Sequence, residues 1–125
     1  MLRLKPGAVG ALALAALLGS LQAASAATSP VPGGNPARGR AFIIKEGCGS
    51  CHEIPGVAAA HGQVGPPLDH MARRTVIAGV LPNTPQNMVR WIQTPQSVVP
   101  GNAMPNMEID DHDARDVAAY LYTLR

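Results

Sequence analysis

The feature that most constrains this chain is a five-residue run with two cysteines and a histidine, Cys48-Gly49-Ser50-Cys51-His52. The pattern C-x-x-C-H is typical of a c-type haem attachment site. The two thiols can add across the two vinyl groups of one haem, and a helical turn brings residues three apart side by side. His52 would then offer its Nε2 to the iron from one face. The motif therefore predicts a fold built around one covalently bound cofactor.

Other chemistries are open to the cysteine pair. A thioredoxin-like dithiol would depend on a lowered thiol pKa, but it needs a βαβ context, and no Val/Ile-rich strand precedes Cys48. A zinc site would need further ligands, and the chain has only two cysteines. A disulfide between Cys48 and Cys51 would be a strained, local bridge of little structural value. Haem attachment is the interpretation that the rest of the chain supports.

The N-terminus has the anatomy of a secretory signal peptide. Arg3 and Lys5 supply positive charge, residues 8–18 are almost uninterruptedly apolar, and an Ala-Ser-Ala cleavage signature lies at residues 24–26. The apolar run is shorter than the roughly 20 residues of a membrane-spanning helix. We therefore expect residues 1–26 to direct export to the periplasm or an equivalent compartment, and the mature protein to have no membrane span. An uncleaved N-terminal anchor is the alternative.

The rest of the chain divides into a flexible leader, residues 27–34, and one small domain, residues 35–125. Ten basic and eight acidic residues give a formal charge of +2, but loss of Arg3 and Lys5 leaves equal numbers of both signs. A nucleic-acid partner would need a basic surface, so none is expected. The chain has only four aromatic residues, and a domain this small has difficulty filling a core. Because a haem would supply apolar surface, we expect the apo-chain to be poorly folded.

Capping signals predict an all-α domain. Asn35 is a good N-cap and Pro36 suits the first helical position, so a helix is expected over residues 35–46. A short helix is expected over residues 68–74, and another over residues 84–95, which begins at Thr-Pro and is ended by a proline.

The last helix is expected to begin after Asp110, a good N-cap. Asp111, Asp113 and Asp116 would favour the positive end of its dipole. No segment is typical of a β-strand. The intervening segments, residues 53–67 and 98–107, are expected to be loops that line a cofactor.

The second iron ligand decides between an electron carrier and a reactive, open iron. The candidates are methionines 71, 88, 104 and 107 and histidines 61, 70 and 112. Met104 is favoured because Pro105 disfavours a helical conformation at Met104, and Pro100 stiffens the loop. A thioether opposite a histidine also raises the reduction potential.

The other candidates have weaker claims. Met107 is the second choice, whereas Met71 and Met88 are expected to pack in the core. His70 is the alternative nitrogen ligand. The two remaining histidines, His61 and His112, lie in polar surroundings and are expected to be exposed.

Taken together, residues 35–125 resemble class I cytochromes c. The matching elements are, in order, Gly39 and Phe42, Cys48 to His52, Gly65-Pro66, Arg74, Pro100-Gly101 with Met104, and Tyr120-Leu121. The resemblance implies a small cytochrome c fold, with three to five helices around one covalent haem c and with the first and last helices crossing. It also implies a one-electron carrier rather than an enzyme.

The resemblance implies roles for single residues as well. Met104 would be the distal iron ligand, opposite His52. The carbonyl of Pro66 would accept a hydrogen bond from Nδ1 of His52, which fixes the tautomer and raises ligand basicity. Arg74 would lie near a haem propionate, and Trp91 would lie close to the methionine side of the haem.

In the same way, Gly39 and Phe42 would pack against Tyr120 and Leu121 where the first and last helices cross. Residues 65–104 are also similar to the cytochrome domain fused to subunit II of some bacterial haem–copper oxidases. That similarity implies a respiratory role near a terminal oxidase.

The sequence allows three ways in which a haem protein of this kind could work. A monomer that docks transiently on redox partner proteins is expected, and balanced charge predicts docking of low salt sensitivity. A haem subunit permanently docked to an oxidase or dehydrogenase is one alternative. A peroxidase-like or gas-binding protein, with Met104 off the iron, is the other.

Overall fold

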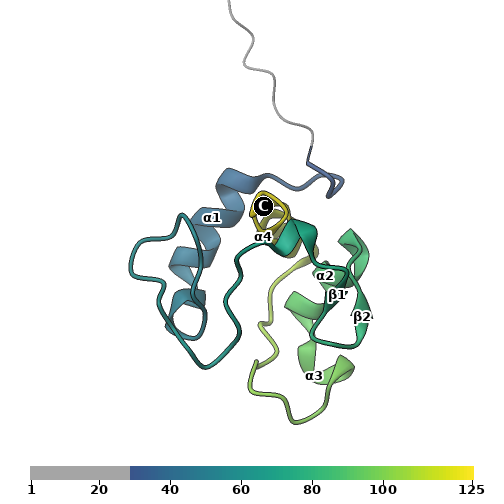
Figure 1. The fold of residues 1–125 in the computed structure, drawn as a ribbon. Coiled ribbons are helices and arrows are strands. Elements are labelled where there is room, and N and C mark those ends of the chain that lie inside the picture. The colour runs from purple at the N-terminus through teal and green to yellow at the C-terminus, as the bar shows by residue number, and fades with distance from the viewer. Residues whose placement is uncertain (1–28) are drawn as a thin grey trace, which may run out of the picture.

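Figure 1 shows a computed structural model that describes residues 29–125, so the expected signal peptide, residues 1–26, lies outside the described residues. Within that range the α-helices are α1 (Pro36–Lys45), α2 (Pro85–Gln93), α3 (Pro95–Val98) and α4 (Asp111–Leu121). Two 3-10 turns, η1 (Cys48–Ser50) and η2 (Met71–Arg73), and two short strands, β1 (Val76–Ile77) and β2 (Leu81–Pro82), lie between them. The expected mostly helical fold of three to five helices is confirmed. No helix in the described range has the length and apolar character needed to cross a membrane.

The three long helices begin where their capping residues predict. The side chains of Asn35, Thr84 and Asp110 accept the N–H groups of residues 38, 87 and 113 at 3.0, 3.2 and 2.8 Å. Each bond satisfies a donor that has no partner within its own helix. The helix starts are therefore decided by local sequence.

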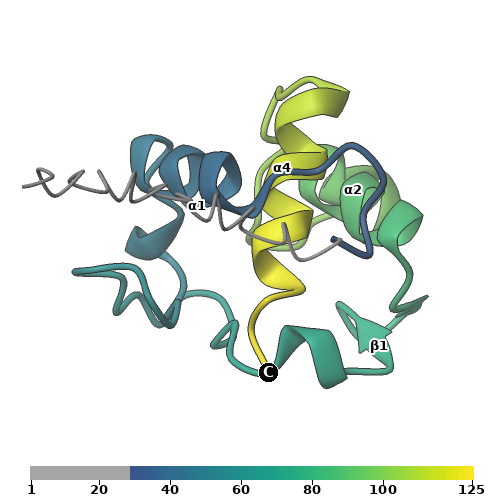
Figure 2. The same cartoon turned by 90° about the horizontal axis from the view of Figure 1, so that it is seen from above.

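Helix α4 lies between α1 and α2, and it crosses α1 closely (Figures 1 and 2). A Cβ on Gly39 would overlap the backbone of Asp116 and Val117, so only glycine allows this approach. The resemblance implied that Gly39 meets Tyr120 and Leu121. That expectation is corrected, because the close contact lies one helical turn earlier on α4.

Asp116 was expected only to favour the positive end of the helix dipole, but the structure gives it a further role. Its side chain is only 1% exposed and faces α1. It accepts hydrogen bonds from the backbone N–H of Asn35 at 2.6 Å and from Nε and Nη2 of Arg38 at 2.6 and 2.9 Å. Burial alone would raise the pKa of Asp116, but these bonds outweigh burial and lower it. Asp116 therefore joins the last helix to the start of the first.

The strand pair is a further difference from the sequence prediction, which had no strands. β1 and β2 are antiparallel, with Val76 opposite Pro82 and Ile77 opposite Leu81. The turn between them has positive φ at both Ala78 and Gly79, 51° and 75°. Such a turn closes a short hairpin even where the flanking sequence is a weak strand former.

Three shorter segments also depart from expectation. The leader was expected to be flexible, yet Val31 is only 2% exposed and belongs to the hydrophobic core. The helix expected to end at Pro95 ends at Gln93, and the four-residue helix α3 follows over Pro95–Val98, where no helix was expected. The expected helix over residues 68–74 is reduced to the 3-10 turn η2, which His70 precedes with a positive φ of 54°.

Candidate cofactor site

A cavity of about 560 Å³ lies among η1, the segment 64–78, helices α2 and α4, and the loop after α3. Its walls are mainly apolar, and Val117 and Leu121 contribute the face of α4. The seven site residues predicted from sequence all line it: Cys48, Cys51, His52, Pro66, Arg74, Trp91 and Met104. The cavity lies within the size range of cofactor sites.

The two thiols come from one 3-10 turn on one wall. The amides of Cys51 and His52 both donate to the carbonyl of Cys48, at 3.2 and 3.1 Å, which closes the turn, and both cysteines line the cavity. The thiols are free, and burial raises the pKa of Cys48. A redox-active dithiol needs the opposite shift, so the burial of Cys48 does not favour the thioredoxin-like interpretation.

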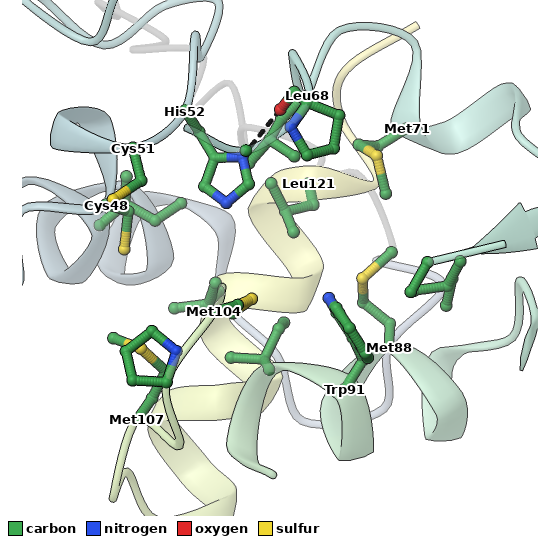
Figure 3. Close-up of a pocket in the computed structure, with 18 of the residues that line it drawn as sticks. Cys48, Cys51, His52, Leu68, Met71, Met88, Trp91, Met104, Met107 and Leu121 are labelled. Atoms are coloured by element: carbon green, nitrogen blue, oxygen red, sulfur yellow. Dashed lines mark hydrogen bonds between the residues drawn. The ribbon is translucent and has the colours of Figure 1, made fainter. Parts of the chain in front are cut away.

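His52 lies on the upper wall of the cavity in the view of Figure 3. Its Nδ1 is 2.7 Å from the carbonyl oxygen of Pro66. A carbonyl can only accept, so Nδ1 carries the proton and donates it. Nε2 is then the nitrogen with a free lone pair, and it points into the cavity (Figure 3).

Gly65 allows this placement of the imidazole. Its N–H donates to the carbonyl of Cys51 at 2.8 Å, which brings the chain directly under the His52 ring. A Cβ at this position would overlap the imidazole. Glycine is therefore the residue that lets the segment before Pro66 approach the histidine.

Met104 lies across the cavity from His52 (Figure 3). Its N–H donates to Oδ1 of Asn102 at 2.8 Å, and its carbonyl accepts from Nε2 of Gln96 at 2.7 Å. Sequence reasoning singled out neither amide residue. No local pattern marks them, because their role appears only when the loop folds back on α3.

The other ligand candidates separate clearly. Met107 lines the same part of the cavity as Met104, whereas Met71 and Met88 are core residues that also reach its wall (Figure 3). His61, His70 and His112 are exposed and do not line the cavity. A nitrogen ligand in place of Met104 would therefore require a large rearrangement.

Arg74 and Trp91 supply polar groups at the cavity wall. Nη2 of Arg74 donates to the carbonyls of Pro67 and Asp69, at 2.6 and 2.9 Å, and to the Asp69 carboxylate at 3.1 Å. The ring nitrogen of Trp91 points into the cavity (Figure 3). Both groups are donors, as a carboxylate-bearing cofactor would require.

Asn83 holds the segment that carries Arg74, and sequence reasoning missed it. Its Nδ2 donates to the carbonyls of Met71 and Arg74 at 2.9 and 2.7 Å. Its Oδ1 accepts from the Tyr122 hydroxyl at 2.7 Å, which connects this wall to the chain after α4.

The side chains around the cavity fit one flat, apolar, iron-bearing group. Imidazole and thioether face each other across it, and this pair is one of the axial ligand sets of haem iron. Two thiols beside the imidazole can anchor the group covalently. The apolar walls would exclude water from its faces.

Known proteins match this chain in sequence and fold. A family model described as Cytochrome c matches residues 36–125. Cytochrome c oxidase subunit 2 of Alkalihalophilus pseudofirmus is 35% identical over 89 residues, which are 70% of this chain and 25% of that protein. The same subunit of Bacillus sp. (strain PS3) is 33% identical over 64 residues, 50% of this chain and 18% of that protein. The chain thus spans a quarter or less of the length of these relatives.

A solved structure, cytochrome c2 from Rhodobacter sphaeroides, has a similar fold. The TM-score is 0.52 at 20% sequence identity, and the match covers 73% of this chain and 96% of the other.

Proposed function

The chain belongs to the cytochrome c family, and from that premise we propose an exported one-electron carrier in which His52 and Met104 are the axial ligands of one haem. Electron transfer and a covalently bound haem follow from family membership. We assign attachment to Cys48 and Cys51. The observation that carries the proposal is a single apolar cavity with imidazole Nε2 and a thioether on facing walls and both thiols between them. When bound, the haem supplies an Fe(III)/Fe(II) couple.

The protein's contribution begins with His52. The hydrogen bond from Nδ1 to Pro66 fixes the tautomer and raises the basicity of Nε2. Gly65 keeps the supporting segment in contact with the ring. The hydrogen bond and the close glycine together hold Nε2 toward the cavity, which limits the conformational freedom lost on ligation.

Met104 sets the potential on the opposite side. A thioether ligand raises the reduction potential, and so does an apolar surrounding that excludes water. Arg74 and Trp91 offer N–H donors at the cavity wall. We assign both to binding the propionates of the haem, which they would orient, and the Arg74 guanidinium would also offset their negative charge.

The partner we propose is a terminal oxidase of a respiratory chain, because both matched relatives are named as oxidase subunits. The exposed side chains of Val64 and Val76 belong to the cavity lining, so the surface around the site includes uncharged, apolar groups. The affinity of docking through such a surface should fall little when salt screens charges. Electron-transfer rates from the reduced holoprotein to a purified bacterial oxidase should therefore change little across a KCl series, and a steep decline would contradict this docking mode.

The absorption spectrum of the ferric holoprotein, exported with haem maturation, tests the ligand assignment. A low-spin spectrum with the weak far-red sulfur-to-iron band is expected. A low-spin spectrum without that band would replace Met104 by a nitrogen ligand. A high-spin spectrum, with carbon monoxide binding after reduction, would favour a peroxidase-like or gas-binding protein.

A further inference from the structure

We propose that Gln96 is a positioning residue that clamps the Met104 loop, residues 99–106, against α3 and so controls how often Met104 leaves the site. The inference rests on the proposed ligation by Met104. Gln96 does not line the cavity. It would act only through the loop.

All the hydrogen-bonding groups of the Gln96 carboxamide are used on this loop. Its Oε1 accepts the N–H of Gly101 at 2.9 Å, and its Nε2 donates to the carbonyls of Asn102 and Met104 at 2.9 and 2.7 Å. The amide orientation follows from the partners, since reversal would place NH₂ against an N–H and oxygen against two carbonyls. One side chain thus pairs with three backbone groups of the loop, at residues 101, 102 and 104.

The base of this clamp is firmly held. Pro95, the first residue of α3, is among the most completely buried side chains of the described chain. The N–H of Gln96 donates to Oδ1 of Asn106 at 3.2 Å, and the N–H of Met107 donates to the carbonyl of Gln93 at 3.2 Å. Both ends of the loop therefore return to the junction of α2 and α3, where Gln96 stands.

The loop has little other support. Across residues 100–106 the described structure has one backbone–backbone hydrogen bond, from Asn102 N–H to Val99 at 3.3 Å. The Asn102 side chain makes two hydrogen bonds within the loop: its Oδ1 accepts the N–H of Met104, and its Nδ2 donates to the carbonyl of Val99. Its one hydrogen bond outside the loop is from Nδ2 to the carbonyl of Pro95 at 3.2 Å. Removing the Gln96 bonds would leave an internally braced loop that can swing away as a unit.

The consequence is measurable in the ferric state. Added imidazole can take the iron only when Met104 has moved away, so its apparent affinity scales with the open fraction. Loss of three hydrogen bonds should raise that fraction at least about tenfold, equivalent to about 1.4 kcal/mol.

The test compares Gln96→Met with Ser97→Ala in the ferric holoprotein. Methionine has a similar length but neither the donors nor the acceptor. Ser97 is the next residue of α3, is exposed, and bonds only to Thr94. Gln96→Met should bind imidazole at least tenfold more tightly than wild type and should speed hydrogen exchange at the Gly101 amide. Ser97→Ala should match wild type in both.

The outcomes separate this inference from the ligand assignment. If the far-red band is present but Gln96→Met equals Ser97→Ala, the clamp is refuted and Met104 ligation stands. If wild type lacks the band, the ligation fails, and exchange at Gly101 still decides whether Gln96 holds the loop. If amides of α1 and α4 accelerate as much as Gly101, Gln96 contributes only to general stability and the inference is overturned.

Discussion

Asp116 at the α1–α4 crossing allows a quantitative stability test. The substitution Asp116→Asn keeps the shape of the side chain and removes its charge. The wild-type carboxylate accepts from the backbone N–H of Asn35 and from two nitrogens of Arg38. A carboxamide has one acceptor oxygen. Its NH₂ group would therefore face a donor at a position that is only 1% exposed.

The expected loss at neutral pH is about 2 kcal/mol of unfolding free energy. A hydrogen bond to a charged group contributes about 1.5–3 kcal/mol. We use the lower part of that range because the side chain of Arg38 is 52% exposed and can turn to water. The pKa of Asp116 is lowered in the folded state. This stabilisation is therefore fully present at a pH above the ordinary pKa of an aspartate, and it is lost as the pH falls through the lowered, folded-state pKa. Variant and wild type should therefore converge in acid.

Guanidinium unfolding of the holoprotein, followed by far-ultraviolet circular dichroism, measures the difference. The matched control is Asp111→Asn on the same helix, whose carboxylate bonds to Arg115 at 2.6 Å but is 61% exposed. An exposed pair of this kind should cost less than about 1 kcal/mol. Equal losses for the two variants, or a loss at Asp116 that does not shrink in acid, would refute the role of the buried carboxylate.

Three substitutions around the cavity extend these tests. Met104→Ala should abolish the far-red band, lower the reduction potential and let carbon monoxide bind the reduced protein. Met107→Ala, on the same part of the cavity, is the control and should change none of these. A far-red band that survives in Met104→Ala would show that Met104 is not the iron ligand. Cys51→Ala should lose stable, doubly linked holoprotein, which mass spectrometry of the exported protein would show directly. Gly65→Ala places a methyl group against His52, so the unfolding free energy should fall by about 1–3 kcal/mol. An unchanged denaturation midpoint and absorption spectrum would mean that the space between Gly65 and the His52 ring can hold a methyl group.

Residues whose role depends on near neighbours were predictable from sequence. The C-x-x-C-H spacing and the caps at Asn35, Thr84 and Asp110 act within one helical turn, so the sequence alone indicated the cofactor class and the helix starts. The resemblance added Pro66 as the hydrogen-bond partner of His52 and Arg74 as a residue near a haem propionate. The structure has the first contact at 2.7 Å and both residues in the cavity lining. Pattern ranked Met104 ahead of Met107 and His70, but it did not show which of these side chains face inward. In the structure Met107 lines the cavity and His70 does not.

The local sequence therefore indicated the chemistry, with two thiols and an imidazole at fixed spacing, and a mostly helical domain to hold them. Tertiary structure decided which distant groups meet. From sequence, Asp116 was expected only to interact with the helix dipole, and its burial against α1 is visible only in the structure. Gln96 belongs to no sequence motif, and its hydrogen bonds to the Met104 loop depend on how that loop folds back on α3. The physical reason is that capping and attachment depend on contacts within a few residues, whereas burial and hydrogen bonding between separate segments depend on packing that no local pattern encodes.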